Sequence, residues 1–227
     1  MSCIKELRKY RVLVGASFGL QMVVCAAALY MLGQAPSLSL SWLATVPPEP
    51  VGGFWLRFMW IWFAANGLMA MGVYLSDELD GLFLLEVWRH SSFRNWLSCK
   101  LSFAWSISLI LYGLAPLPWL LALHANEVAS VLAAIVFLVA YGAHLLLIFF
   151  VLMLTGTARS LSFTATLLLH AGNVLSNGAG WPNTMQYFLI GEHASLVSLS
   201  VIAGLLALTT WLIRERTAIA SVLERKD

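Results

Sequence analysis

The stretch from Val128 to Leu154, VASVLAAIVFLVAYGAHLLLIFFVLML, decides the fold class. It contains no Asp, Glu, Lys or Arg, and it exceeds the about 20 apolar residues that cross a hydrocarbon layer of about 30 Å. Similar runs recur between polar breaks along the chain. We therefore expect residues 1–227 to form a single all-α membrane domain. Its six transmembrane helices are predicted at about residues 12–33, 54–75, 100–123, 128–154, 161–177 and 194–213.

The composition of the whole chain is that of a membrane protein. Of its 227 residues, 60% are apolar and only 11% are charged, and the mean hydropathy is +0.84. A soluble domain averages about 45–50% apolar and about 25% charged residues. This composition excludes a soluble enzyme, a nucleic-acid binder with a basic face and a disordered scaffold. We expect the chain to contact membrane lipid and no nucleic acid.

The placement of lysine and arginine predicts that both termini lie in the cytoplasm. Basic residues are retained on the cytoplasmic side of membrane proteins. With the N-terminus inside, every Lys and Arg except Arg57 lies on the inner side. The connections predicted to face outside, 34–53, 124–127 and 178–193, contain none. The first apolar run exceeds the about 7–15 residues of a secretory signal, so we expect a retained, multi-pass protein.

No residue pattern predicts catalysis, a metal site or a nucleotide site. The five histidines are scattered without an HExxH motif, and Cys3, Cys25 and Cys99 lack CxxC spacing. No lysine follows a glycine, which excludes the phosphate-binding loop GxxxxGK[ST]. We therefore expect no catalytic residue, no metal and no cofactor on this chain. If ATP drives the protein, another chain must bind it.

The most informative segment is the predicted cytoplasmic connection SDELDGLFLLEVWRHSSFRNWLSCK, from Ser76 to Lys100. Its acidic start suits a helix N-terminus, with Ser76 as the cap and the following carboxylates complementing the helix dipole. An apolar stretch, 82–87, and basic residues follow. The pattern predicts a short helix that lies along the inner membrane face with its apolar side down.

This order of features resembles the ABC-2 type exporter permease family. The corresponding connection of that family reads approximately E-x-x-x-G-T-L-E-L-L-L-x-x-P-x-S-R-x-x-x-L-x-x-K. Gly81 and Lys100 stand at the family's spacing, with Glu78 as the acidic lead and Arg94 near the family's arginine. The chain departs from the pattern at Leu84, where the family usually has glutamate. The layout also agrees over nearly the whole chain, with a basic amphipathic stretch at 4–11 that is similar to the family's interface helix and a re-entrant outer segment at 178–193.

The resemblance implies a membrane permease subunit of an ATP-driven exporter in the bacterial cytoplasmic membrane. Its partners would be a separate ABC ATPase, which binds ATP and Mg, and a second copy of the permease or a homologous permease. The connection would contain the coupling helix, at about 77–94, that docks on the ATPase. The docking and tethering residues would be Asp77, Glu78, Asp80, Gly81, Leu82, Phe83, Leu85, Glu86, Arg89 and Arg94.

Polar side chains inside the predicted spans are a second set of candidates, because uncompensated polar groups are costly in lipid. By analogy with the family, the set at the seam of a permease dimer would include Gln21, Asn66, His170 and Asn173. These four residues are candidates for a substrate pathway. Interhelical hydrogen bonding is an equally good interpretation of the same residues. For His144, a neutral ring bonded to a neighbouring helix is the favoured interpretation.

Three other functions stay open at the level of sequence. The acidic-glycine element also resembles the cytochrome c maturation permease subunit, which would imply a haem-related cargo. A non-transport membrane anchor that recruits a soluble protein through the inner connection fits the same layout. A membrane enzyme would have to use His144 or His170.

Overall fold

The computed structural model describes residues 8–33, 53–79, 93–118, 121, 128–154, 158–178, 207–208 and 211. Every regular element in these ranges is helical. The elements are α2 (Arg11–Gly33), α4 (Gly53–Leu79), α6 (Phe93–Ser108), the π-helix η1 (Leu109–Leu114), α8 (Val128–Leu154) and α9 (Arg159–Gly178). The all-helical fold class is therefore confirmed for this part of the chain.

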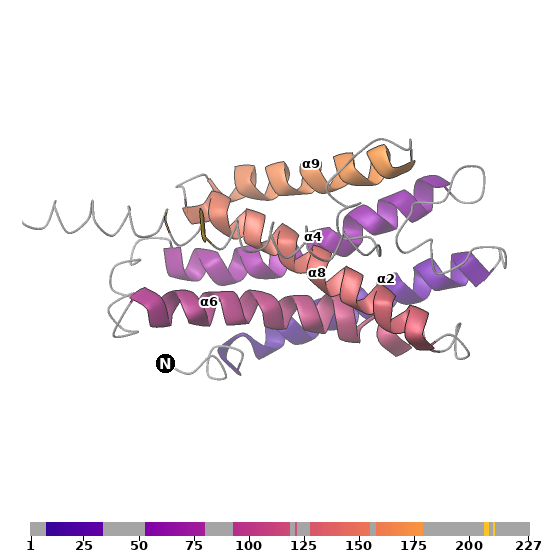
Figure 1. The fold of residues 1–227 in the computed structure, drawn as a ribbon, viewed down its shortest axis with the longest axis horizontal. Helices are drawn as coiled ribbons and strands as arrows, with labels where there is room; N and C mark the ends of the chain where they lie inside the picture. The colour runs from indigo at the N-terminus through magenta and orange to yellow at the C-terminus, as the bar shows by residue number, and fades with distance from the viewer. Residues whose placement is uncertain are drawn as a thin grey trace, which may run out of the picture.

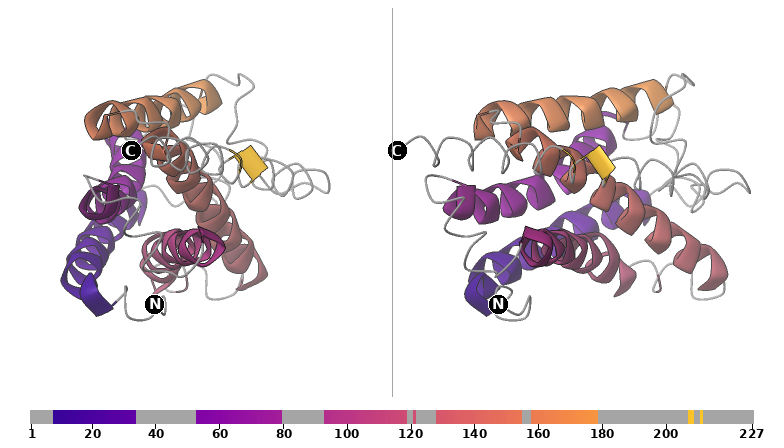
Figure 2. Two further views of the ribbon diagram at one scale, coloured as in Figure 1. Left: turned by 90° about the vertical axis from the view of Figure 1, so that its left-hand side faces the viewer. Right: turned by 60° about the vertical axis from the view of Figure 1, so that its left-hand side comes forward.

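The five α-helices form an elongated bundle in which successive helices run up and down along its long axis (Figure 1). The view along the long axis shows α2, α6 and α9 at separate positions on the outside of the bundle (Figure 2, left). Helix α4 packs against α2, α6, α8 and α9, so it is the central helix. The middle turns of α4 are rich in small residues, which let neighbouring helices approach closely. They include Ala64, Ala65, Gly67, Ala70 and Gly72.

Tyr112 lies on the π-helix that continues α6, and it packs against both α4 and α8. Its ring fills gaps left by Gly67 on α4 and Gly142 on α8, where an added Cβ atom would collide with the ring. Its hydroxyl donates a hydrogen bond of 3.1 Å to the Ala64 carbonyl. A π-helix is an unusual local structure that often occurs at functional sites. Here it delivers one buried tyrosine to the α4–α8 contact.

Two described stretches are long and apolar enough to cross a membrane, Asn95–Leu114 and Ile135–Leu154. Shorter apolar helices cover Arg11–Ala27 and Ile61–Ser76. The helices at 11–33, 53–79, 128–154 and 159–178 match four expected spans closely, but six spans are not supported by the described residues. The expected sixth span and the re-entrant segment at 178–193 lie almost entirely outside them.

The outer surface of the bundle carries large apolar side chains. Val12 is 77% exposed and Leu168 is 67% exposed, and apolar residues on α2, α8 and α9 share this property. Extended exposed apolar surface marks contact with a membrane or another protein. This surface is compatible with membrane association.

The structure corrects the expected start of the coupling helix. Ser76, Asp77 and Glu78 belong to the last turn of α4, which ends at Leu79, so Ser76 is not an N-cap. These residues therefore belong to a helix C-terminus, where the dipole does not favour negative charge. Helix α6 begins at Phe93, which places Arg94 in its first turn and Lys100 in its interior. Only residues after Leu79 and before Phe93 are left for a separate coupling element, and these lie outside the described residues.

Candidate functional site

A buried lysine lies over two aromatic rings near the end of the bundle where α4 stops and α6 starts, and two further rings pack against one of them. We call this group, Tyr10, Tyr74, Trp96, Lys100 and Phe103, the Lys100 cluster. The rings of Tyr74 and Phe103 are stacked with centroids 3.7 Å apart. Tyr10 meets the Tyr74 ring edge-on at 5.1 Å and lies 6.0 Å from the Phe103 ring. The cluster therefore joins the beginning of α2, the end of α4 and the beginning of α6.

Lys100 has no solvent-exposed surface, which is rare for a lysine. Its Nζ lies 4.9 Å from the centroid of the Tyr74 ring and 5.9 Å from that of Trp96. An ammonium over an aromatic face is attracted by the ring quadrupole, and the attraction strengthens when the pair is desolvated. Trp96 also contacts Phe150 of α8 with ring centroids 6.3 Å apart. The lysine thus lies where three helices meet.

Arg159 joins α9 to the same end of α4. Its guanidinium donates a 2.6 Å hydrogen bond to the Ser76 hydroxyl. The arginine chain passes Gly72, where an added Cβ would lie 3.9 Å from Cδ of Arg159 and 3.4 Å from Phe149. A hydrogen bond from a charged donor is stronger than one between neutral groups. The last turns of α4 are consequently held by α2, α6 and α9.

The predicted docking residues are divided by the structure. The backbone of Asp77 and Glu78 continues α4, and that of Arg94 belongs to α6. The seven others, Asp80, Gly81, Leu82, Phe83, Leu85, Glu86 and Arg89, lie outside the described residues. The helices on either side of the connection are in contact, because Lys100 of α6 lies over the Tyr74 ring of α4. Docking at residues 77–94 stays a prediction.

A polar network holds α2 against the middle of α4. The side-chain amide of Asn66 donates hydrogen bonds of 2.8 Å to the Ser17 carbonyl and 2.8 Å to Oε1 of Gln21. Gln21 in turn donates a 3.3 Å bond to the Phe63 carbonyl. Both predicted residues are buried, and both make interhelical bonds, as the alternative interpretation predicts.

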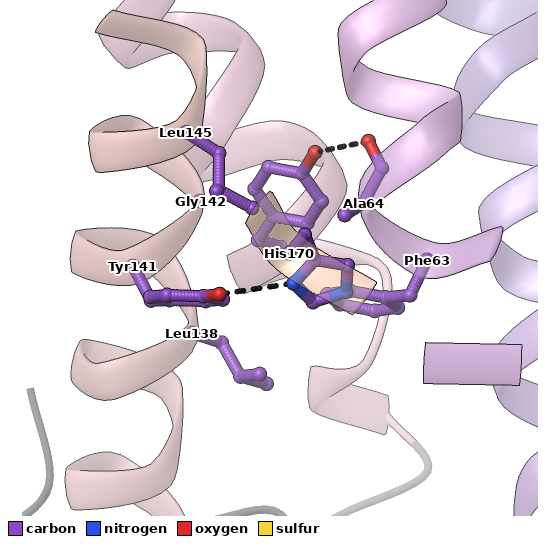
Figure 3. A pocket seen from close by; sticks show the side chains of 8 residues that line it. Phe63, Ala64, Leu138, Tyr141, Gly142, Leu145 and His170 are labelled. Atoms are coloured by element: carbon purple, nitrogen blue, oxygen red, sulfur yellow. Dashed lines mark hydrogen bonds between the residues drawn. The ribbon is translucent and has the colours of Figure 1, made fainter. Parts of the chain in front are cut away.

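A second network joins α8 to α9 through a tyrosine. Asn173 donates a 3.1 Å hydrogen bond to the Tyr141 hydroxyl, and that hydroxyl lies 2.9 Å from Nδ1 of His170. Figure 3 shows Tyr141 and His170 beside Phe63 and Ala64, around a cavity of about 10 Å³ that Tyr112 also lines. A cavity of this size has room for about one water molecule. It is too small for an organic substrate.

The four predicted pathway residues thus form two networks within one chain. Gln21 and Asn66 lie between α2 and α4, and His170 and Asn173 lie between α9 and α8. Sequence reasoning missed Tyr141, the shared partner. A signal was present, because His170 and Asn173 are three residues apart and therefore share one helix face. Contact of these residues with substrate stays a prediction.

His144 lies close to the second network. It is buried, and the centroid of its ring lies 6.4 Å from that of Tyr141. Among the residues that the structure describes, no group of three His, Cys, Asp or Glu side chains is arranged to hold a metal ion. Cys25 and Cys99 are buried and not joined in a disulfide.

A scan against protein-family models and searches of the curated proteins and of the solved structures found no match to this chain.

Proposed function

We propose that the chain is the membrane-spanning permease subunit of an ATP-driven ABC exporter. In this proposal it crosses the cytoplasmic membrane six times with both termini inside. It works beside a second copy or a homologous permease. A separate ABC ATPase binds ATP and Mg and docks on the connection between α4 and α6.

The observation that carries the proposal is the contact between the two ends of this connection. Tyr74, shortly before it, and Lys100, shortly after it, lie 4.9 Å apart measured from ring centroid to Nζ. A segment that receives force needs a firm base, and this contact, with the Tyr74–Phe103 stack, supplies one. The family resemblance of residues 78–100 supports the same function from the sequence side.

The route by which force would reach the bundle follows from the contacts of α4. A displacement of the connection acts first on the last turn of α4 and the first turns of α6. Tyr10 carries it to α2, and the Ser76–Arg159 bond carries it to α9. An exposed ion pair contributes only about 0–1 kcal/mol. Docking therefore depends more on Phe83 and the neighbouring leucines. Full burial of each such side chain contributes about 1.5–3 kcal/mol of free energy.

The experiment purifies the tagged full-length chain from its native membrane and identifies co-purifying proteins by mass spectrometry. We expect an ATPase with a phosphate-binding loop, and we expect ATP hydrolysis by the complex in lipid nanodiscs. The double variant Phe83→Asp with Leu85→Asp should lose most of the ATPase. The conservative double variant Phe83→Leu with Leu85→Met should keep it.

A matched control puts the same two charges on the other side of the membrane. Leu38→Asp with Leu40→Asp alters the connection predicted to face outside, and it should leave the ATPase bound. Equal loss from both Asp pairs would argue against docking at residues 77–94. Recovery of a soluble partner that is not an ATPase would overturn the transporter proposal and favour a membrane anchor.

A further inference from the structure

The Lys100 cluster contains a buried lysine, which an apolar contact between α4 and α6 does not require. The stacked rings of Tyr74 and Phe103 already join the two helices. A leucine or methionine at position 100 would fill a similar space without the cost of removing an ammonium from water. The lysine is nevertheless fully buried and lies over two aromatic rings. This arrangement points to a role for the charge itself.

A buried ammonium differs from a methyl group in how it responds to movement. The free energy of burying apolar surface depends on the area buried and not on direction. The attraction between an ammonium and a ring face, by contrast, depends on where the ring lies and falls as the ring moves away. Lys100 belongs to α6, its nearer ring belongs to α4, and Trp96 contacts Phe150 on α8. The charge therefore opposes sliding of α4 against α6, and the neighbouring Trp96–Phe150 contact ties this part of α6 to α8.

We propose that Lys100 is a positioning residue that holds the end of α4 and the start of α6 in one register, so that both helices move together when the connection is displaced. This role rests on the proposed function, because it matters only if a partner acts on residues 80–92. Lys100 touches neither substrate nor nucleotide in this role. It acts through Tyr74 and Trp96.

The protein supplies its own matched control. Lys9 also lies over an aromatic ring, with Nζ 4.7 Å from the Tyr10 centroid, but its side chain is exposed. Lys9→Met removes the same type of charge and contact where water can replace them. Lys100→Met removes the buried one. Lys100→Arg keeps the charge, and Lys100→Gln is a second neutral variant of similar length in case methionine disturbs folding.

The first measurement reports the register of the two helices in the full-length chain in nanodiscs. Spin labels are placed at Val73→Cys on α4 and Ser102→Cys on α6, both at exposed positions, in a background without Cys3, Cys25 and Cys99. We expect the dipolar broadening between the labels to be well defined in the parent, Lys9→Met and Lys100→Arg proteins. It should become heterogeneous in the two neutral Lys100 variants. Identical spectra for parent and neutral variants would overturn the inference.

The second measurement uses the complex with the co-purified ATPase and Mg·ATP. Lys100→Met should bind the ATPase as the parent does but reduce its stimulation by the permease at least threefold, and Lys100→Arg should restore it. A loss explained by a smaller amount of folded complex, with normal stimulation per complex, would mean that Lys100 is only structural. Failure of the parent chain to bind an ATPase would overturn the proposed function, while the label pair still decides whether Lys100 fixes the register.

Discussion

The contact of Tyr112 with Gly142 gives a direct test of the packing. The tyrosine ring occupies the space that any side chain at position 142 would need. A methyl group at Gly142 would collide with three atoms of that ring. The ring cannot easily retreat, since its hydroxyl is bonded to the Ala64 carbonyl and its far edge meets Gly67. Gly142→Ala is therefore an overpacking substitution.

The expected magnitude combines two opposing effects. Overpacking a core costs about 1–3 kcal/mol. Replacing glycine by alanine inside a helix returns about 0.5–1 kcal/mol by restricting the unfolded chain. For Gly142→Ala these effects leave a net destabilisation of up to about 2.5 kcal/mol. Gly172→Ala, where an added Cβ meets nothing within 4 Å, keeps only the favourable effect and should be neutral or slightly stabilising.

The free energy of unfolding is measured by titrating the purified protein in mild-detergent micelles with a denaturing detergent. Gly142→Ala should unfold at a lower denaturant fraction than the parent, and Gly172→Ala at an equal or higher one. Combining Gly142→Ala with Tyr112→Ala should cost less than the sum of the single changes, because the second removes the colliding ring. Equal stability of the two glycine variants would refute the packing described for Tyr112.

Three further contacts give predictions in the same unfolding assay. A double-mutant cycle of Tyr141→Phe and His170→Leu should give a coupling energy of about 0.6 kcal/mol and at most about 1.7, the range of interhelical hydrogen bonds in membranes; a coupling of zero would mean that the two side chains do not bond. Asn66→Leu, which removes two bonds of 2.8 Å, should destabilise the protein by about 1–2 kcal/mol and loosen α2, seen as faster amide exchange there. Ser76→Ala and Arg159→Gln should each release the start of α9, and the two changes together should cost less than their sum; full additivity would argue against the 2.6 Å bond.

The sequence predicted the helices better than their contacts. The range 128–154 was predicted with the bounds that α8 has, because polar residues mark both of its ends. The third span was expected to open at Lys100, because a charged residue normally ends an apolar run. The helix begins at Phe93 instead, and aromatic rings compensate the buried charge. That compensation is tertiary and is not visible from the run itself.

The assignment of Ser76 failed for a related reason. Serine followed by acidic residues is the pattern of a helix start, but the same residues can close a helix when a neighbour bonds the hydroxyl. Here Arg159 does so from 83 positions away. The four polar residues predicted inside the spans are buried and hydrogen-bonded between helices, as every such group in a bundle needs a partner, while their contact with substrate stays a prediction. Their partners, above all Tyr141, depend on how each helix is rotated, which the sequence does not specify.

The contacts of α4 explain why force applied next to it would spread. Between helices surrounded by lipid there is little hydrophobic driving force, so close packing and polar bonds must hold them together. Three of the neighbours of α4 are joined to it by a specific hydrogen bond: Asn66 bonds α2, Tyr112 of the π-helix that continues α6 bonds Ala64, and Arg159 of α9 bonds Ser76. The Asn66 and Tyr112 contacts lie near the middle of α4, and the Ser76–Arg159 bond lies in its last turn. A movement at Leu79 would therefore act first on α6 and α9 and only later on the Tyr112 contact. If the proposed ATPase drives this movement, cross-links that fix α9 to α4 should block it more strongly than a cross-link between α2 and the middle of α4.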